Sequence, residues 1–384
     1  MQHYNTQRRL LNIIIPLFWF AQYVYVPFLT PYLMDMGIVS LAAGAVVGAY
    51  GFSQLVLRIP LGIAADKLQN HRLFISIGMI LAGISSLGLM FFPSTALLIL
   101  ANALSGAASS TWLSFTLMYV AANPNISQGK SIGRSNALNN FGILTAYLVG
   151  GLLFDKIGIK TLFVFSFAAG MLGLLLTFFV KSSHVERKPI KTADLLPVFK
   201  DKRLLYYTLL ATAGQFMAFA TAMSFTSIAA KSLGAKGIVL GICSALYTGG
   251  GICGSLFSTS NTAHRISSKK LLPAAFTGFA IYACTLGLAG SLYIVLAFQV
   301  IGGFCATTIF STVMASAIEK ISLEKRSTAL GFFQSVYGLG MALGPIVMGA
   351  LWGLGRASAF LLIAIVPAAF ACVTLAKSIL SKKT

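Results

Sequence analysis

Charged residues are scarce in this chain. Only 9% of its 384 residues are Asp, Glu, Lys or Arg, whereas 57% are hydrophobic. A soluble domain of average composition carries about 25% charged residues and covers its surface with them. A chain with so little charge cannot cover a water-facing surface. Its composition therefore excludes an ordinary soluble protein and indicates that a lipid bilayer is its solvent.

The residues of catalytic and metal sites form no recognisable constellation. The five cysteines show no metal-ligand spacing and lie in or beside apolar stretches. In such stretches a thiol acts as a small hydrophobic side chain. They are Cys243, Cys253, Cys284, Cys305 and Cys372. No nucleophile is accompanied by a base, and the glycines at 249–251 lack the Lys of a phosphate-binding loop. We therefore expect no enzymatic activity, no metal and no cofactor.

Acidic residues are the rarest charged class. Eight Asp and Glu face 28 Lys and Arg, which gives a net charge of +20. Nucleic-acid binders concentrate such charge on one face of a folded domain. Here the basic residues occupy short polar gaps between long apolar runs, so we expect no nucleic-acid partner.

Long apolar runs dominate the rest of the chain. A membrane-spanning helix needs about 20 mostly apolar residues, and twelve such runs can be marked. We predict spans at residues 10–33, 40–64, 73–92, 95–121, 133–154, 160–181, 204–230, 237–259, 271–290, 292–318, 327–351 and 357–378. The first run is too long for a secretory signal and lacks a clear cleavage site, so we interpret it as a retained span.

The distribution of basic residues tests this count. Cytoplasmic loops of membrane proteins carry an excess of Lys and Arg. If the N-terminus is cytoplasmic, 22 of the 28 basic residues fall on the inner side, five fall in outer turns, and Arg58 lies within a span. If one span too many or too few had been assigned, the basic residues would no longer alternate between inner loops and outer turns. We therefore expect twelve helices in the cell's inner (plasma) membrane, with both termini in the cytoplasm.

The chain divides into two halves. We predict an N-terminal six-helix bundle over residues 1–181, a cytoplasmic linker over 182–203 that is rich in Lys and Arg, and a C-terminal six-helix bundle over 204–384. The fifth and eleventh spans end on similar glycine-rich segments, 197–198 residues apart. Many transporters are built from such repeats and hold the substrate near the midplane between them.

One motif resembles the signature of a known protein family. The segment from Gly62 to Arg72 follows the second span and reads GIAADKLQNHR. It resembles the signature of the major facilitator superfamily, in which Gly is followed four residues later by Asp and then by basic residues. The twelve spans, the central loop and the inner termini match this family over the whole chain. Asn70 and His71 depart from the signature, where the family often has Gly and paired basic residues.

The resemblance implies a gate at the inner face. Glycine permits a close helix crossing, and the Asp66 carboxylate would face the N-terminal partial positive charge of the eleventh span. The resemblance implies that Asp66 contacts this helix and that Arg72 stabilises the Asp66 carboxylate. The alternative is that the segment is a positively charged loop that only fixes the topology. The expected gating residues are Gly62, Asp66, Lys67, Arg72, Gly344 and Pro345.

Two other family motifs are altered. The fifth span keeps Gly142, Gly150 and Gly151 of the exporter motif but lacks its Gly-Pro pair, and the better copy lies in the eleventh span. In the fourth span, Asn102 stands four residues before Gly106, where the family places Arg. Both departures weaken an assignment to proton-coupled drug antiport.

Arg58 is the only charged residue predicted well inside a span. It precedes Asp66 by eight residues, or about 12 Å along a helix, which places it near the midplane. Such an Arg costs roughly 2.5–3.5 kcal/mol. It either binds an anionic group of the substrate or is satisfied within the protein. No acidic residue accompanies it at this depth, which argues against an organic cation as substrate.

Uncharged polar residues mark the predicted cavity faces. Each could instead form an ordinary interhelical hydrogen bond. Together with Arg58, the expected substrate-binding residues are Gln22, Tyr25, Asn102, Asn136, Asn140, Gln215, Tyr247, Gln299, Gln334 and Tyr337.

These observations predict an all-α membrane protein with the major facilitator fold. We expect secondary active or facilitated transport of a small solute by alternating access, with an organic anion or a neutral polar metabolite favoured. A drug or metabolite efflux antiporter and a transporter-like solute sensor are the alternatives, and measured flux would exclude the sensor. We expect a monomer whose partners are its small-molecule substrate and the bilayer.

Overall fold

The structure is a computed structural model that describes residues 2–92, 94–181, 200–322 and 325–380. Within these ranges the side chains at 2–5, 66, 264, 327 and 328 are not described. Most of the predicted linker, residues 182–199, therefore lies outside the described residues.

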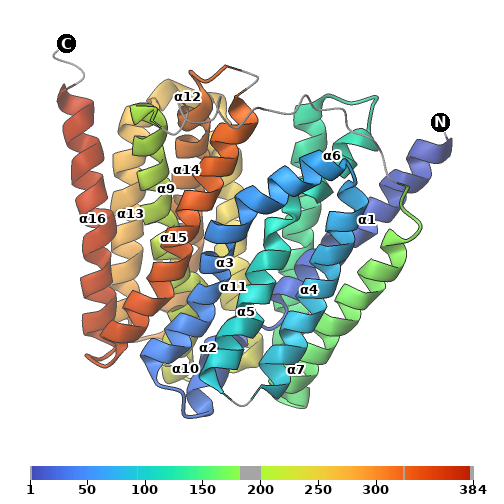
Figure 1. The fold of residues 1–384 in the computed structure, drawn as a ribbon. Coiled ribbons are helices and arrows are strands. Elements are labelled where there is room, and N and C mark those ends of the chain that lie inside the picture. Colours follow the sequence, from blue (N-terminus) through green and yellow to red (C-terminus); the bar gives the residue numbers. More distant parts are fainter. Residues whose placement is uncertain (1, 93, 182–199, 323–324, 381–384) are drawn as a thin grey trace.

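The described chain is helical (Figure 1), and its helices form twelve membrane spans. Eleven segments are long and apolar enough to span a bilayer, and one of them, α7, has 50 residues and is broken at Gly158 into two spans. In chain order the spans are α1 (Gln2–Tyr23) with α2 (Val26–Asp35), α3 (Ser40–Leu68), α4 (His71–Phe91), α5 (Thr95–Ser110) with α6 (Trp112–Ala121), the two parts of α7 (Gln128–Thr177), α9 (Lys202–Ala220) with the π-helical turn η2 (Thr221–Phe225) and α10 (Thr226–Ser232), α11 (Gly237–Ser258), α13 (Ser268–Leu288), α14 (Leu292–Ile318), α15 (Arg326–Trp352) and α16 (Arg356–Leu380). The short helix α12 (Asn261–Ile266) lies between two spans. The predicted count is confirmed.

Three spans that the sequence predicts as continuous are interrupted. Pro27 lies in the first turn of α2, and a proline there cannot donate the hydrogen bond that would extend α1. The fourth span turns at Thr111, whose hydroxyl donates to the Ala108 carbonyl at 2.7 Å. The seventh widens into η2, where the Ser224 hydroxyl donates to carbonyls of the preceding turn. Hydrophobic periodicity does not reveal such local breaks.

The turn between the fifth and sixth spans is a single residue. Gly158 has φ +71° and ψ 169°, with helix on both sides. A side chain is strained at such a φ, which is why glycine is suited to this position. The predicted boundary near residues 155–159 is thereby confirmed, with a much shorter connection than a loop.

The helices form two groups side by side (Figure 1). The helices from α1 to α7, blue to green, occupy one side, and those from α9 to α16, lime to red, the other. Both ends of the described chain lie on one face, which we call the terminal face. The opposite face carries α2, α10 and the bend of α7.

The two groups cross closely towards the opposite face. A Cβ added to Gly44 of α3 would lie 2.1 Å from the Pro345 carbonyl oxygen of α15, and one added to Gly48 would lie 2.4 Å from the Ala342 carbonyl oxygen. The Ser40 hydroxyl donates to the Gly349 carbonyl at 2.8 Å. Backbones approach this closely only where side chains are absent. The opposite face is therefore closed.

The same pair of helices is open towards the terminal face. A Cβ added to Gly62 of α3 or to Gly331 of α15 would meet no atom within 4 Å. The sequence predicted that Gly62 marks a close crossing with the eleventh span. In the conformation described here this crossing is not made, so it stays a prediction for a conformation in which the terminal face closes.

Candidate functional site

A small cavity lies between the two groups of helices. Its volume is about 30 Å³, and a cavity needs about 10–15 Å³ to hold one water molecule, so there is room for very few waters. It is lined by Gln22, Tyr23, Tyr25, Val26, Leu29, Val47, Tyr50, Asn102, Ser105, Phe219 and Met223. None of these lining residues is charged. The walls must separate before a metabolite can enter.

Gln22 is the centre of a hydrogen-bond network in the wall of this cavity. Its amide nitrogen donates to the Ser105 carbonyl at 3.0 Å and to the Ser109 hydroxyl at 3.1 Å. The Ser105 hydroxyl donates to the Gln22 amide oxygen. Tyr25 donates to Ser105 at 3.5 Å, and the hydroxyls of Tyr50 and Ser109 are 2.8 Å apart. The network joins α1, α2, α3 and α5.

Asn102 ties α5 to α3. Its amide nitrogen donates to the carbonyls of Val46 at 2.7 Å and Val47 at 3.2 Å, and the residue is 5% exposed. An Arg at this position would bring a charge into an uncharged wall. The family's usual Arg is therefore replaced by a residue that serves the packing of the first group.

Aromatic rings form the contact across the cavity. The rings of Tyr50 and Phe219 stack with centroids 5.8 Å apart and planes 20° apart. Tyr147 packs edge-on against Tyr23, with centroids 5.9 Å apart, and its hydroxyl lies 3.8 Å from the Met223 sulfur. Each group thus contributes rings or sulfur to an apolar part of the site, beside the amide and hydroxyl groups of the first group.

Arg58 lies outside the residues that line this cavity. It is half-buried, and its guanidinium donates to the Tyr337 hydroxyl at 2.8 Å, which joins α3 to α15. Nearby, the Ser335 hydroxyl donates to the Leu55 carbonyl at 2.5 Å. Both ion pairs among the described residues lie elsewhere. Arg58 therefore has a neutral partner, and that partner belongs to the other half.

Two predicted residues of the second half form a separate buried cluster. The Tyr282 hydroxyl donates to the Gln299 amide oxygen at 3.2 Å, and the rings of Tyr247 and Tyr282 are 6.3 Å apart. The Tyr247 hydroxyl and the Gln299 amide nitrogen are buried and have no hydrogen-bond partner in the described structure. These groups can form hydrogen bonds with a water molecule or with a polar group of a ligand, but they do not line the cavity.

The other predicted binding residues are not brought into the cavity. Asn136 is exposed, whereas Asn140, Gln215 and Gln334 are half-buried. They lie on α7, α9 and α15. Their proposed contacts with a solute stay predictions.

The predicted gating residues lie at two levels of the protein. Asp66 belongs to the end of α3, but its side chain is not among those described, so its predicted contact with the eleventh span lies outside the described residues. Lys67 is exposed. Arg72 donates to the Phe178 carbonyl at 2.9 Å and lies over the Phe178 ring. Arg72 thus ties the third span to the end of the sixth.

Gly344 and Pro345 belong to the closed part of the interface. A Cβ on Gly344 would lie 2.3 Å from the Phe216 carbonyl oxygen of α9, and the Pro345 carbonyl faces Gly44. The exporter-like motif of the eleventh span is therefore placed where α15 is wedged between α9 and α3.

Sequence reasoning missed eight of the eleven lining residues, of which Val26, Leu29 and Val47 are aliphatic. Tyr23, Tyr50, Ser105, Phe219 and Met223 were not predicted to bind a solute. Aromatic and Met residues in a span usually pack against other helices, so composition does not distinguish them from core. The spacing of Ser105 and Ser109 on one helical face is the signal that could have drawn attention to this wall.

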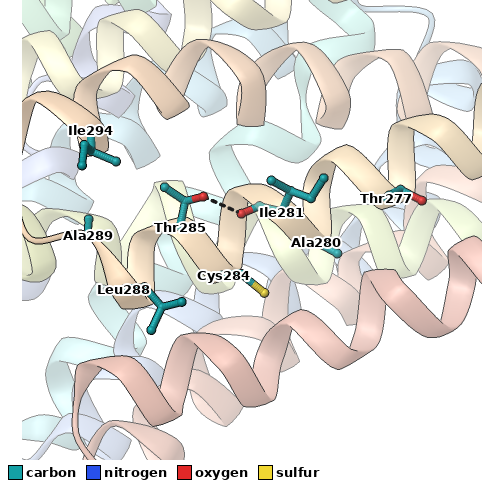
Figure 2. A pocket seen from close by; sticks show the side chains of 8 residues that line it. All are labelled: Thr277, Ala280, Ile281, Cys284, Thr285, Leu288, Ala289 and Ile294. Atoms are coloured by element: carbon teal, nitrogen blue, oxygen red, sulfur yellow. Dashed lines mark hydrogen bonds between the residues drawn. The ribbon is translucent and has the colours of Figure 1, made fainter.

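A larger apolar groove lies on the outside of the second group. Its volume is about 400 Å³, and Figure 2 shows its lining side chains on α13 and the start of α14. Ile281 and Leu288 are 52% and 66% exposed. Apolar, exposed side chains on a spanning helix are typical of a surface that faces lipid. We do not assign a solute to this groove. It is lined by Thr277, Ala280, Ile281, Cys284, Thr285, Leu288, Ala289 and Ile294.

Known proteins resemble this chain in sequence and in fold. The sequence profile of the Major Facilitator Superfamily matches residues 11–229 and 208–382. The quinolone resistance protein NorA of Staphylococcus aureus is 24% identical over 362 residues, which cover 91% of this chain and 90% of NorA. The crystal structure of the nucleoside transporter NupG has a TM-score of 0.81 at 15% identity and covers 98% of this chain and 99% of NupG. A bacterial homologue of the lysosomal transporter Spinster, in an inward-facing and unoccupied conformation, has a TM-score of 0.75 at 16% identity, over 98% of this chain and 95% of that one.

Proposed function

Since the chain belongs to the major facilitator superfamily and is a transmembrane transporter, we propose that it carries a small uncharged polar solute by alternating access. The cavity between the halves carries this proposal. It combines amide and hydroxyl groups with aromatic rings and has no charged lining residue. A buried charge on the solute would lack a partner there and would cost several kcal/mol. The moving units are the two predicted bundles, residues 1–181 and 204–384.

One observation favours an organic anion as the second candidate. Arg58 is a permanent cation within a span, and its described partner, the Tyr337 hydroxyl, is neutral. A solute carboxylate or phosphate could supply the opposite charge when the halves separate at the terminal face. Efflux of a drug is the third candidate function, because the relative NorA is described as a quinolone resistance protein.

Replacement of Arg58 separates the first two candidates. For an uncharged solute, we expect Arg58→Gln to weaken the binding of every ligand by the same factor, because the change removes only the contact between Arg58 and Tyr337. That contact contributes at most about 1.5–3 kcal/mol, or about ten- to a hundredfold in affinity. For an anion, Arg58→Gln should weaken anions selectively, and Arg58→Lys should retain part of their affinity. Binding titrations of wild type and both variants measure this. Selective loss of anion binding would contradict an uncharged solute.

The substrate can be found by measuring ligand-induced changes in melting temperature. Purified protein would be screened with nucleosides, because NupG is described as a nucleoside transporter, with matched nucleoside monophosphates, and with fluoroquinolones, because NorA is described as a quinolone resistance protein. Flux of each hit into proteoliposomes distinguishes a transporter from a sensor. Our proposal predicts that nucleosides or similar uncharged solutes raise the melting temperature more than their phosphorylated forms do. The reverse order would support the anion candidate.

We further propose that the terminal face is cytoplasmic. The excess of Lys and Arg on that side supports this orientation. In a cysteine-free background, a single cysteine within the linker at 182–203 should resist a membrane-impermeant thiol reagent in intact cells, whereas one at Val39 should react. Labelling of the linker in intact cells would reverse the orientation.

A further inference from the structure

The same short segment ends two spans. Residues 62–69 end α3 and are followed by α4, and residues 151–158 end the first part of α7. Both begin with Gly, have Asp at the fifth position and Lys at the sixth, and end on a residue with positive φ: +48° at Gln69 and +71° at Gly158. The two segments therefore share three residues at equal spacing and a positive φ at their eighth position.

The two copies lie on opposite faces. The N-terminal half of this family contains two sets of three spans with inverted topology, which relates the second span to the fifth. The same symmetry in the other half relates α11 to α15, the helices that α7 and α3 respectively cross. One copy therefore lies at the terminal face beside α15, and the other lies at the opposite face beside α11.

The copy at the opposite face is engaged. Both carboxylate oxygens of Asp155 accept the backbone N–H of Gly237, at 3.0 and 2.9 Å. Gly237 is the first residue of the 22-residue helix α11, so the carboxylate meets the N-terminal partial positive charge of this helix. A Cβ on Gly241 would lie 2.9 Å from the Gly151 Cα. The aspartate and the glycine of the segment thus contact α11 together.

The glycine of the copy at the terminal face makes no such contact with α15. Gly331 has a similar place in α15 to that of Gly241 in α11: it is the sixth residue of its helix, and Gly241 is the fifth of its own. Both Gly62 and Gly331 have open space where a Cβ would be. The contact made by Gly151 and Gly241 at one face is therefore absent from the equivalent pair at the other.

We propose that Asp155 is the latch of the opposite face. Its carboxylate holds the N-terminus of α11 while that face is closed, and it must release the helix before the halves can part there. This inference rests on the alternating-access function proposed above. Since Asp66 has the same position in the shared segment as Asp155, we expect the terminal face to close by an equivalent contact with the N-terminus of α15.

The latch can be tested by distances between spin labels, without a substrate. Labels on cysteines at Val39 and Leu354 report on the opposite face, and labels at Leu68 and Ile266 report on the terminal face. These residues are 69%, 61%, 59% and 37% exposed, and the five native cysteines are replaced first. Spectra are recorded on full-length protein in lipid nanodiscs.

Asp155→Ala should raise the ratio of open to closed opposite faces about three- to tenfold, because a carboxylate at a helix N-terminus contributes on this scale. The terminal-face distance should shorten in the same population. Asp155→Asn keeps one acceptor oxygen and should have a smaller effect. The matched comparison is Asp35→Asn. The ion pair of Asp35 with Lys231 also joins the two groups at the opposite face, but it is exposed, so its loss should change the ratio less than about twofold.

Gly241→Leu separates failure of the latch from failure of alternating access. Its side chain would collide with α7, so it should open the opposite face and close the terminal face. If Gly241→Leu moves the two distances in opposite directions but Asp155→Ala behaves like Asp35→Asn, the latch is overturned and alternating access stands. If no variant moves the two distances in opposite directions, both proposals are overturned.

Discussion

Replacement of Gly44 by Leu should abolish transport while the protein still inserts into the membrane. The Gly44 Cα faces the Pro345 carbonyl, and even a Cβ there would be 2.1 Å from the oxygen. Overpacking costs about 1–3 kcal/mol, and each 1.4 kcal/mol is a factor of about ten in an equilibrium. The population closed at the opposite face should therefore fall about ten- to a hundredfold, and flux should fall with it.

Two further leucine variants show whether this loss is specific. Gly62→Leu adds its side chain in open space, so it should leave the described conformation intact and instead hinder closure of the terminal face. Gly133→Leu also meets open space and is exposed, so it controls for the residue change itself. The flux of the solute found by the screen, and the two spin-label distances, measure all three variants. Normal flux in Gly44→Leu would show that the crossing of α3 and α15 need not close.

Replacement of Gln22 by Leu should cause the largest loss of stability. Gln22 is 2% exposed and makes two donated hydrogen bonds and one accepted one. The change removes the acceptor of the buried Ser105 hydroxyl and one donor to Ser109, whose hydroxyl keeps its bond with Tyr50. A buried donor left without an acceptor costs about 1–3 kcal/mol. The melting temperature of the empty protein should fall by several degrees, and the affinity for the solute should fall as well.

Gln215→Leu is the matched control for this prediction. Gln215 is half-buried, and the described structure gives its side chain no hydrogen bond. The same chemical change should therefore lower the melting temperature of the empty protein much less. Equal losses in the two variants would mean that the network around Gln22 contributes little to the stability of the first group.

The spans could be predicted from the sequence because a bilayer imposes one simple requirement. Each crossing needs a long apolar run, and the basic residues between runs fix the count. The local interruptions could not be predicted in the same way. The π-turn at Thr221–Phe225 is stabilised by hydroxyl bonds to the preceding carbonyls, and a sequence pattern does not distinguish that use of Ser224 from a bond to another helix.

The candidate site was predicted in part. Gln22, Tyr25 and Asn102 do line the cavity, because polar groups in a span must find partners and therefore face other helices or a cavity. The same rule does not say which partner is found. The rule therefore cannot distinguish Asn102, whose amide donates to α3 carbonyls, from a polar residue that is available to bind a ligand. The contact of Asp155 could not be predicted from the sequence, because its partner is the backbone N–H of Gly237 in a distant helix.

The uncharged lining of the cavity has a consequence for energetics. A membrane voltage of 100 mV does about 2.3 kcal/mol of work on each elementary charge that crosses it. Since the lining residues carry no charge, a carrier loaded with an uncharged solute moves no net charge through this site. Voltage would then neither drive nor oppose the loaded step. The solute's own concentration difference, or an ion bound together with it, would set the direction, and without such an ion the protein would equilibrate the solute either way across the bilayer.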